Sequence, residues 1–434
     1  MTEASNTPRR GWSNADGSSI SAMSFHRPKL RLAAWLWLKG LLPVGAVACL
    51  AIAVQAAEYE SDNNSFAFQL YNHLRGTDGS VFLSPFSVSE ALAMTSAGAR
   101  RETAVQMARV LDVPPGKEAD ALYAAQAEQL AKLGSAGAIE LRMANSLWPQ
   151  SGYPLLKDYL ARVRKSYGVD VIPLDFAHNA EHARGAINDW VAKETRGKIA
   201  DLIPPGILDS LTRLVLVNAI YFKGTWESPF VGEYTREAPF HVAKDRTVQV
   251  PTMVQSGDFR YANLDRLEIL ELPYAGGQVS MLILLPREQD GIAQLEQELS
   301  ASNLAAWQDE LREQEVVVYL PRFRMACMSR VDEALKAMGM TDAFDSARAD
   351  FTGMDGRPHW LYLGAVLHKA YIEVNEQGTE AAAATAVTME AGAAPGEPPP
   401  TFRADHPFIF MIREKESGTV LFMGRVIDPL ASIQ

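Results

Sequence analysis

The feature that most constrains the fold of this chain is a stretch near its C-terminal end, EQGTEAAAATAVTMEAGAAPGEPPPTF, which spans residues 376–402. Unstructured segments longer than about 12–15 residues are uncommon in compact domains, and those that occur are usually functional or disordered. A disordered linker has no reason to keep a two-residue period, yet this stretch keeps one from Thr379 to Ala391. We therefore interpret it as a functional segment.

The two faces of this stretch differ in composition. One face is small or apolar throughout: Thr379, Ala381, Ala383, Thr385, Val387, Met389 and Ala391. The other face has a glutamate at each end, Glu380 and Glu390. Such alternation is typical of a strand with one buried face, and at about 3.3 Å per residue it would run roughly 43 Å. Prolines follow at once and cannot donate to a sheet, so the strand must end there. A surface segment with a buried-strand pattern predicts two states, loop and strand.

The composition excludes several classes of protein. The chain has 434 residues, of which 47% are hydrophobic and 21% charged, and this excludes collagen, coiled coil or disorder as descriptions of the whole. A net charge of −11 argues against a protein that binds nucleic acid. Two cysteines, Cys49 and Cys327, exclude a disulfide scaffold and a cysteine-based zinc site. No phosphate loop or dinucleotide fingerprint is present, so we expect no cofactor.

Residues 1–56 have the parts of a secretory signal. Basic residues precede the apolar run Leu32–Val54, and small residues follow it. We expect cleavage before Ala57 and export to the extracellular space or the periplasm. The alternative is a retained membrane anchor, because the run is long enough to span a bilayer. Lys39 and Pro43 interrupt the run and favour cleavage.

Hydrophobic periodicity places most helices early and most strands late, without regular alternation, which predicts an α+β fold. Ser87 or Ser89 is the expected N-cap of a helix over residues 90–111. The other expected helices cover residues 66–74, 119–133, 179–194 and 329–338. The expected strands cover residues 140–148, 214–222, 268–274, 279–286, 316–323, 361–374, 408–412 and 420–427.

Several short blocks, in one order along the chain, resemble the serpin family of serine protease inhibitors. The resemblance covers roughly residues 61–429. Its blocks are FLSPFS (82–87), NDWVAKETRGKI (188–199), LVNAIYFKGTW (216–226), LPY (272–274), LPRF (320–323), DFTGM (350–354), NEQGTEAAAAT (375–385), HPF (406–408) and FMGR (422–425). Any single block is weak evidence, but this many blocks in one order identify the chain as a member of the family.

The resemblance implies one domain over residues 57–434, with three β-sheets, eight or nine helices and an exposed reactive loop at about 376–401. It implies an inhibitor, not an enzyme, whose partner is a serine protease. The protease forms an acyl-enzyme with the loop, and the cut loop then inserts into the central sheet as a new strand. We expect a monomer that contacts a membrane only if the N-terminal segment is retained. The alternative is a serpin used as a binding or chaperone module; the small inward face argues against it, because a charged or bulky face would block insertion.

The resemblance also assigns roles to residues of three groups. The hinge of the loop comprises Glu376, Gly378, Thr379, Glu380, Ala381, Ala382, Ala383, Ala384 and Thr385. A shutter cluster of Ser84, Ser87, Asn218 and His368 would form a buried hydrogen-bond network that lets two strands part. A breach group of Trp226, Arg322 and Glu376 would hold the top of the sheet by an ion pair. The alternatives are a core histidine without further role and a surface ion pair of little energetic value.

The expected scissile bond follows from a count that the resemblance supplies. The seventeenth residue from Glu376 is Gly392, which places the cut between Gly392 and Ala393. The stretch after it is longer than in familiar members, so Met389, Ala391 and Ala394 remain alternatives. No Lys or Arg lies between residues 376 and 401. We therefore expect an elastase-like or subtilisin-like protease rather than a trypsin-like one.

One motif points to a different chemistry. His178, Glu181 and His182 fit the H-x-x-E-H pattern of a zinc peptidase. On a regular helix the two histidines would share a face. Because five-residue patterns arise by chance, we give this alternative little weight.

Overall fold

The computed structural model describes residues 64–76, 79–114, 116–133, 139–379 and 398–431. These residues belong to a unit that spans Ala56–Gln434. The predicted leader over residues 1–56 and the loop residues 380–397 lie outside the described part. Within the described ranges, no helix is both long enough and apolar enough to cross a membrane.

Most helices lie early in the described chain, as predicted. One helix covers residues 64–74, and nine more carry labels, which is one helix more than the upper number expected. They are α3 (Pro85–Ser96), α4 (Arg101–Leu111), α5 (Lys117–Leu133), α6 (Lys157–Tyr167), α7 (Phe176–Glu194), α8 (Ile292–Glu298), α9 (Ala301–Asp309), α10 (Asp332–Ala337) and α11 (Thr352–Asp355).

The prediction of one helix over residues 90–111 is wrong, as is its predicted N-cap. The chain forms two helices here, α3 and α4, which are separated by a turn. Gly98 permits this turn to pack closely, because a Cβ at this position would lie 2.2 Å from the Met354 Cγ. The N-cap of α3 is Ser84, whose hydroxyl oxygen accepts a hydrogen bond from the Ser87 N–H at 3.2 Å. Pro85 follows at the first helical position, where its missing N–H costs nothing.

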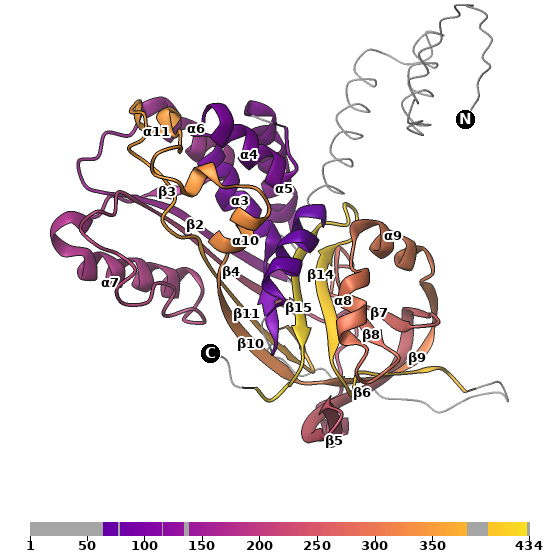
Figure 1. Cartoon of the computed structure of the whole chain (residues 1–434). Helices are drawn as coiled ribbons and strands as arrows, with labels where there is room; N and C mark the ends of the chain where they lie inside the picture. The colour runs from indigo at the N-terminus through magenta and orange to yellow at the C-terminus, as the bar shows by residue number, and fades with distance from the viewer. Residues whose placement is uncertain (1–63, 77–78, 115, 134–138, 380–397, 432–434) are drawn as a thin grey trace, which may run out of the picture. The chain divides into compact units, whose positions relative to one another are not determined.

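The central sheet has six strands in the order β10-β11-β12-β4-β2-β3. These strands are β2 (Ile139–Pro149), β3 (Asp170–Val171), β4 (Leu214–Thr225), β10 (Phe323–Arg330), β11 (Leu367–Asn375) and β12 (Gly378–Thr379). The helix α7 covers one face of this sheet, and α3 to α6 lie on the other (Figure 1). Apolar side chains such as Ile187 and Val191 of α7 pack against Val217 and Ala219 of β4. The sheet is therefore buried on both faces in its middle.

The second sheet has nine strands. Its order is β1-β15-β14-β8-β7-β6-β9-β13, with β5 paired to β6. The strands are β1 (Val81–Leu83), β5 (Arg236–Ala243), β6 (Arg246–Asn263), β7 (Leu267–Pro273), β8 (Val279–Pro286), β9 (Arg312–Pro321), β13 (Thr401–Arg403), β14 (Phe408–Glu414) and β15 (Val420–Val426). In the described residues the strands thus form two sheets, where the family resemblance implied three. The reason is that β6, 18 residues long, pairs with β5, β7 and β9 and so joins two of the expected sheets.

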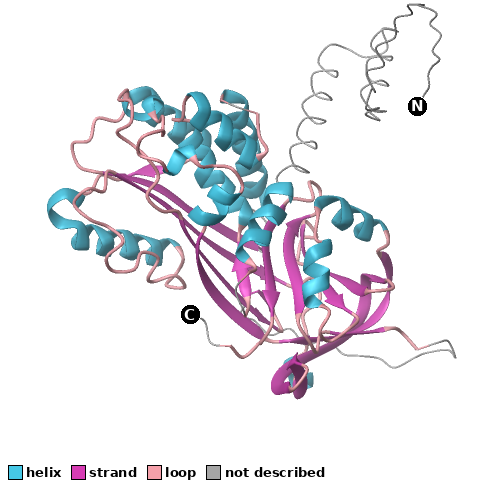
Figure 2. Cartoon of the chain, in the orientation of Figure 1, coloured by secondary structure: helices cyan, strands magenta, loops and turns pink. Residues whose placement is uncertain are grey.

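Figure 2 shows the strands in magenta among the cyan helices. Several predicted strand boundaries differ from the structure. The predicted strand over residues 316–323 ends at Pro321 in one sheet, and Phe323 begins a strand in the other, with Arg322 between them. The predicted helix over 329–338 shortens to α10 because β10 continues to Arg330. The predicted strand over 361–374 begins only at Leu367. The remaining predicted strands are confirmed, including the C-terminal hairpin of β14 and β15.

Candidate functional site

The four residues of the shutter cluster meet beneath the contact between β4 and β11. The Nε2 atom of His368 accepts from the Ser84 N–H at 2.9 Å, and its Nδ1 atom lies 2.9 Å from the Asn218 Oδ1. Because Nε2 accepts, Nδ1 carries the proton and donates to Asn218. The Asn218 amide in turn donates to the carbonyl oxygen of Ser87 at 2.8 Å and to its hydroxyl. All four residues are at most 3% exposed, so the network is internal.

His368 is both a core residue and a structural link. Complete burial lowers its pKa to about 3, so the imidazole stays neutral at any ordinary pH. A neutral ring can accept at one nitrogen and donate from the other, which is the arrangement found here. The ring joins α3 to β4 through hydrogen bonds that a moving β11 must break. The structure therefore places His368 where the sequence predicted it.

The network continues to two residues that the sequence analysis did not single out. The Asn218 amide donates to the Asn145 Oδ1 on β2 at 2.7 Å, and the Asn145 amide donates to the Glu90 carboxylate on α3. Glu90 is only 1% exposed. Burial raises the pKa of Glu90 to about 7, although the hydrogen bond from Asn145 lowers it. The signal in the sequence was a single glutamate within SVSEALAM, the otherwise uncharged start of a buried helix.

The breach group lies where β11 passes into the loop. The Arg322 guanidinium donates from Nε to the Glu376 carboxylate at 2.7 Å and also from Nη2, and the Thr235 hydroxyl donates to the same oxygen. Burial raises the pKa of Glu376, but the hydrogen bonds from Arg322 and Thr235 outweigh it and hold this pKa below its usual value. The predicted ion pair is thus present; Glu376 is buried, at 6% exposure, whereas the Arg322 side chain is 45% exposed.

Trp226 joins the breach group through the backbone. Its indole Nε1 donates to the Asn375 carbonyl oxygen at 3.0 Å, and its backbone N–H donates to the Gln377 carbonyl oxygen at 2.9 Å. The indole stacks on Tyr274 with ring centroids 4.6 Å apart. Trp226 therefore holds the chain on both sides of Glu376 without taking part in the ion pair.

The first residues of the hinge are already part of the central sheet. The short strand β12 pairs with β11 on one side, where Thr379 faces Val374, and with β4 on the other, where Thr379 faces Gly224. The Thr379 side chain is fully buried, and its hydroxyl lies 2.7 Å from the Tyr274 hydroxyl. The other hinge residues, Glu380 to Thr385, and the predicted scissile pair of Gly392 and Ala393 lie outside the described residues.

Gly378 is the residue that lets the chain enter between the two strands. It has a φ of +144°, in the region that favours glycine. A Cβ at this position would lie 2.0 Å from the Gly224 carbonyl oxygen, which is closer than any side chain can approach. A glycine is therefore required at Gly378 for β12 to form as it does.

A cavity of about 410 Å³ lies at the opposite end of the central sheet. The first residues of β4, including Leu214 and Leu216, line it together with the segment that precedes β11. β4 and β11 pair directly only over Asn218–Tyr221 and His368–Tyr371. Below this contact their N-terminal ends therefore face the cavity instead of each other.

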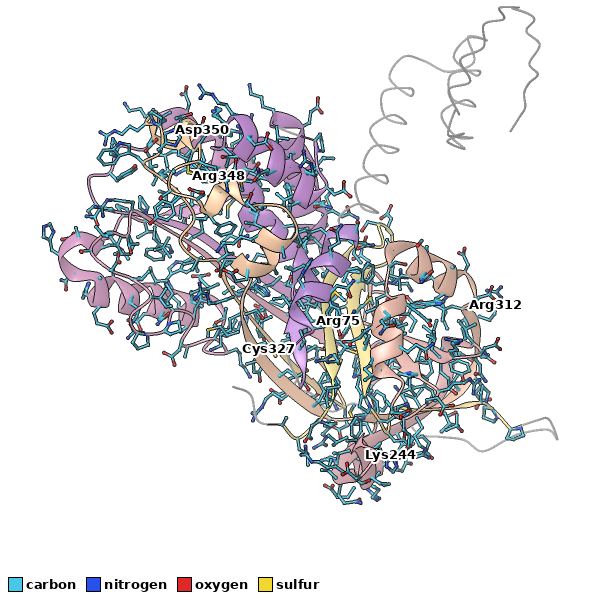
Figure 3. All side chains as sticks on the ribbon, in the orientation of Figure 1. Arg75, Lys244, Arg312, Cys327, Arg348 and Asp350 are labelled. Carbon is cyan, nitrogen blue, oxygen red and sulfur yellow. The ribbon has the colours of Figure 1, made fainter. Side chains whose placement is uncertain are left out.

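The two remaining candidates from the sequence have other surroundings. In the H-x-x-E-H motif, Asn179 has non-helical dihedral angles, His178 contacts Asp175, and Glu181 binds Arg184. No group of three potential metal ligands occurs among the residues that the structure describes. Cys327 lies half-buried on β10 (Figure 3), and burial raises the pKa of its thiol, which therefore stays protonated.

Comparison with known proteins agrees with this geometry. The family model described as "Serpin (serine protease inhibitor)" matches residues 61–429. Leukocyte elastase inhibitor A of Mus musculus is 39% identical over 86% of this chain and all of that protein. The structure of uncleaved ovalbumin is similar with a TM-score of 0.76 and 33% identity, covering 85% of this chain and 99% of ovalbumin. A loop-inserted structure of cleaved ovalbumin is equally similar, with a TM-score of 0.77 and 33% identity over 86% of this chain and all of that one.

The family match spans most of the chain, and in the described residues His368 contacts Asn218 and Arg322 binds Glu376. Serpins are inhibitors of serine proteases rather than enzymes. The chain belongs to the serpin family.

Proposed function

We propose that this protein is a suicide-substrate inhibitor of serine proteases, which traps an acyl-enzyme by inserting its cleaved reactive loop between β4 and β11. The observation that carries this proposal is the position of β12. Its two residues lie between β4 and β11 and pair with both, so a loop that continues from β12 would enter the sheet between these two strands.

The strand registers on the two sides agree on where the loop would go. Thr379 faces Gly224 on β4, and continuing this antiparallel register brings Thr385 opposite Asn218. Thr379 also faces Val374 on β11, and continuing that register brings Thr385 opposite His368. Asn218 and His368 are now direct neighbours in the sheet. Insertion must therefore break the His368–Asn218 hydrogen bond and place Thr385 between them.

The far end of the path has room for larger side chains. The same register brings Val387 opposite Leu216 and Met389 opposite Leu214, and both leucines line the cavity of about 410 Å³. These are the two largest side chains on the inward face of the loop, whose other members are Thr or Ala. Burial of apolar side chains in this cavity would add to the gain from new backbone hydrogen bonds.

We propose a target with a shallow specificity pocket. The predicted scissile bond, Gly392–Ala393, is flanked by small uncharged residues. A relative that is 39% identical is named a leukocyte elastase inhibitor. Both facts favour an elastase-like or subtilisin-like protease.

A denaturing gel tests the proposal directly. We expect a covalent band at the summed mass after mixing with pancreatic elastase or subtilisin, because the ester bond to the loop survives denaturation. Mass spectrometry of the released C-terminal fragment identifies the scissile bond. Clean turnover without such a band, across several proteases of both kinds, would falsify the proposal.

We also propose that the chain is exported, acts as a monomer and loses its leader by cleavage before Ala57. The proposal rests on the basic flank, apolar run and small-residue exit of residues 1–56. N-terminal sequencing of the mature protein tests it. A blocked or intact N-terminus in a membrane fraction would support the anchor instead.

A further inference from the structure

A chain of hydrogen bonds runs in one direction from the contact between the strands to a buried carboxyl group. The Ser84 N–H donates to His368, which donates to Asn218. Asn218 donates to Asn145, which donates to Glu90. Each side chain in the middle accepts at one end and donates at the other, so the chain needs a terminal acceptor. Glu90 supplies that acceptor from α3.

The carboxyl group lies under the place where the sheet must open. The first link between the strands is the His368–Asn218 bond, which insertion breaks if the function proposed above is correct. Asn218 and Asn145 connect this bond to Glu90. The Asn218 amide nitrogen lies 2.7 Å from the Asn145 Oδ1. If β4 and β11 moved apart, solvent would reach the shutter cluster through the gap between the two strands.

We propose that Glu90 is a positioning residue, acting through Asn145 and Asn218, whose protonation state sets how readily β4 and β11 part at His368. This inference rests on the proposed insertion of the loop. It concerns the rate of opening, which decides whether a trapped protease is carried away or escapes by hydrolysis.

Ionisation of Glu90 has two opposing effects on the opening of the sheet. The larger effect decides whether ionisation favours the open or the closed state. A charged Glu90 would polarise the hydrogen-bond chain and strengthen the His368–Asn218 bond, but such strengthening is only about 10–30% per bond. Burial raises the pKa of Glu90 to about 7, and against the ordinary value of 4.5 for a solvated glutamate this corresponds to about a 300-fold preference of the closed site for the neutral acid. Burial therefore dominates, and ionisation favours the open sheet in which water reaches the charge.

The direction with pH follows from linkage. The closed site keeps its proton up to about pH 7, whereas a solvated carboxyl group releases it near pH 4.5. Between these values the open state binds fewer protons, so opening becomes easier as pH rises and levels off above about pH 7. Opening also frees His368, whose pKa is about 3 in the closed site, and a solvated imidazole binds a proton near pH 6.5. His368 therefore favours opening below about pH 6.5, opposite to Glu90, and its effect must be separated from that of Glu90 by a variant.

Other titratable and charged groups occur on the elements packed against α3 or joined to it by the network. Among the described residues, the pKa of Glu90 responds only to burial and to Asn145, and none of these groups shifts it. They include exposed Arg101, Glu102 and Arg109 on α4; Asp120 and Tyr123 on α5; Tyr159, Arg162 and Tyr167 on α6; Glu140 and Arg142 on β2; Lys223 on β4; His368 and Lys369 on β11; and Arg425 on β15, paired with Glu296.

The test uses a probe that needs no protease. A fluorescently labelled synthetic peptide with the sequence of residues 379–391 is mixed with the full chain, and its uptake is followed by anisotropy at pH 5.5, 6.5, 7.5 and 8.5. We expect the ratio of the wild-type rate to the Glu90→Gln rate to rise about 3- to 10-fold over this range, because His368 titrates alike in both proteins and opening solvates Glu90 only in part. Glu90→Gln, which lacks the titrating carboxyl group, should show no rise in rate with pH.

The control is Glu102→Gln, which removes an exposed carboxylate from α4, and it should follow the wild type. If Glu90→Gln does not fold, Glu90→Thr supplies a second neutral variant with the same expected absence of a rise. A Glu90→Gln profile parallel to the wild type, so that the ratio of the two rates does not change with pH, overturns the inference and leaves the proposed function intact. Absence of uptake at any pH overturns both, and absence of the covalent gel band identifies failure of the proposed function separately.

Discussion

At the scale of single residues, insertion of the loop depends on the first of its side chains to be buried in the sheet. Thr379 is fully buried and hydrogen-bonded to Tyr274, so an arginine at this position would bring an unpaired charge into the sheet. A cost of about 3 kcal/mol would slow insertion about 100-fold. We expect Thr379→Arg to be cleaved as a substrate, with far more than one molecule consumed per protease trapped. Thr388→Arg, on the predicted outward face, is the matched control, and full trapping by Thr379→Arg would contradict the insertion model.

The ion pair at the breach gives a second prediction at this scale. Glu376→Gln keeps the shape of the side chain but loses the charge that Arg322 binds. Because Arg322 is 45% exposed, we discount the pair for solvent screening and expect a loss of about 1 kcal/mol in the free energy of unfolding. The pKa of Glu376 is lowered in the folded protein, so its contribution is present above pH 4.5 and disappears as pH falls further. Urea unfolding at pH 7 and pH 3 measures this: the variant should differ from the wild type only at pH 7.

At the scale of elements, the short strand β12 depends on one glycine. Gly378→Ala would place a methyl group against the Gly224 carbonyl oxygen, at a φ that alanine rarely adopts. We expect β12 to leave the sheet and the amide of Trp226, which now donates to Gln377, to exchange faster with solvent. Hydrogen exchange followed by mass spectrometry reads this out. Gly185→Ala, in open space on α7, is the control, and unchanged protection of residues 224–226 in Gly378→Ala would show that β12 does not need the glycine.

At the scale of the whole molecule, the proposed function requires that the central sheet of the intact protein can accept one more strand. Insertion of residues 380–391 would add roughly ten ladder hydrogen bonds, for a net gain of about 10 kcal/mol. With an unfolding entropy near 2.1 cal/mol/K per residue, this raises the Tm by about 10 °C or more. Calorimetry of intact and loop-cleaved protein checks the prediction. If both forms melt at the same temperature, the loop does not insert.

Much of this architecture is readable from the sequence because it follows local rules. The period of two in residues 379–391, the FLSPFS block and the alanine-rich hinge depend only on neighbours in the chain, and they identified the family. Errors occurred where tertiary contacts override local preference. Residues 90–111 look like one helix, but contact between Gly98 and Met354 makes two, and residues 316–323 look like one strand, but the chain changes sheets at Arg322.

The sequence by itself determined the family and the absence of charge from one face of residues 379–391, because alternation and motif order are properties of the chain. Only the tertiary structure showed that β12 pairs with both β4 and β11, and the proposed place of Thr385 between Asn218 and His368 is inferred from that register. It alone showed that the hydrogen-bond chain ends at Glu90. Register and burial are the physical reason: both depend on which distant strands become neighbours, and the pKa of a carboxyl group depends on how much water its neighbours exclude.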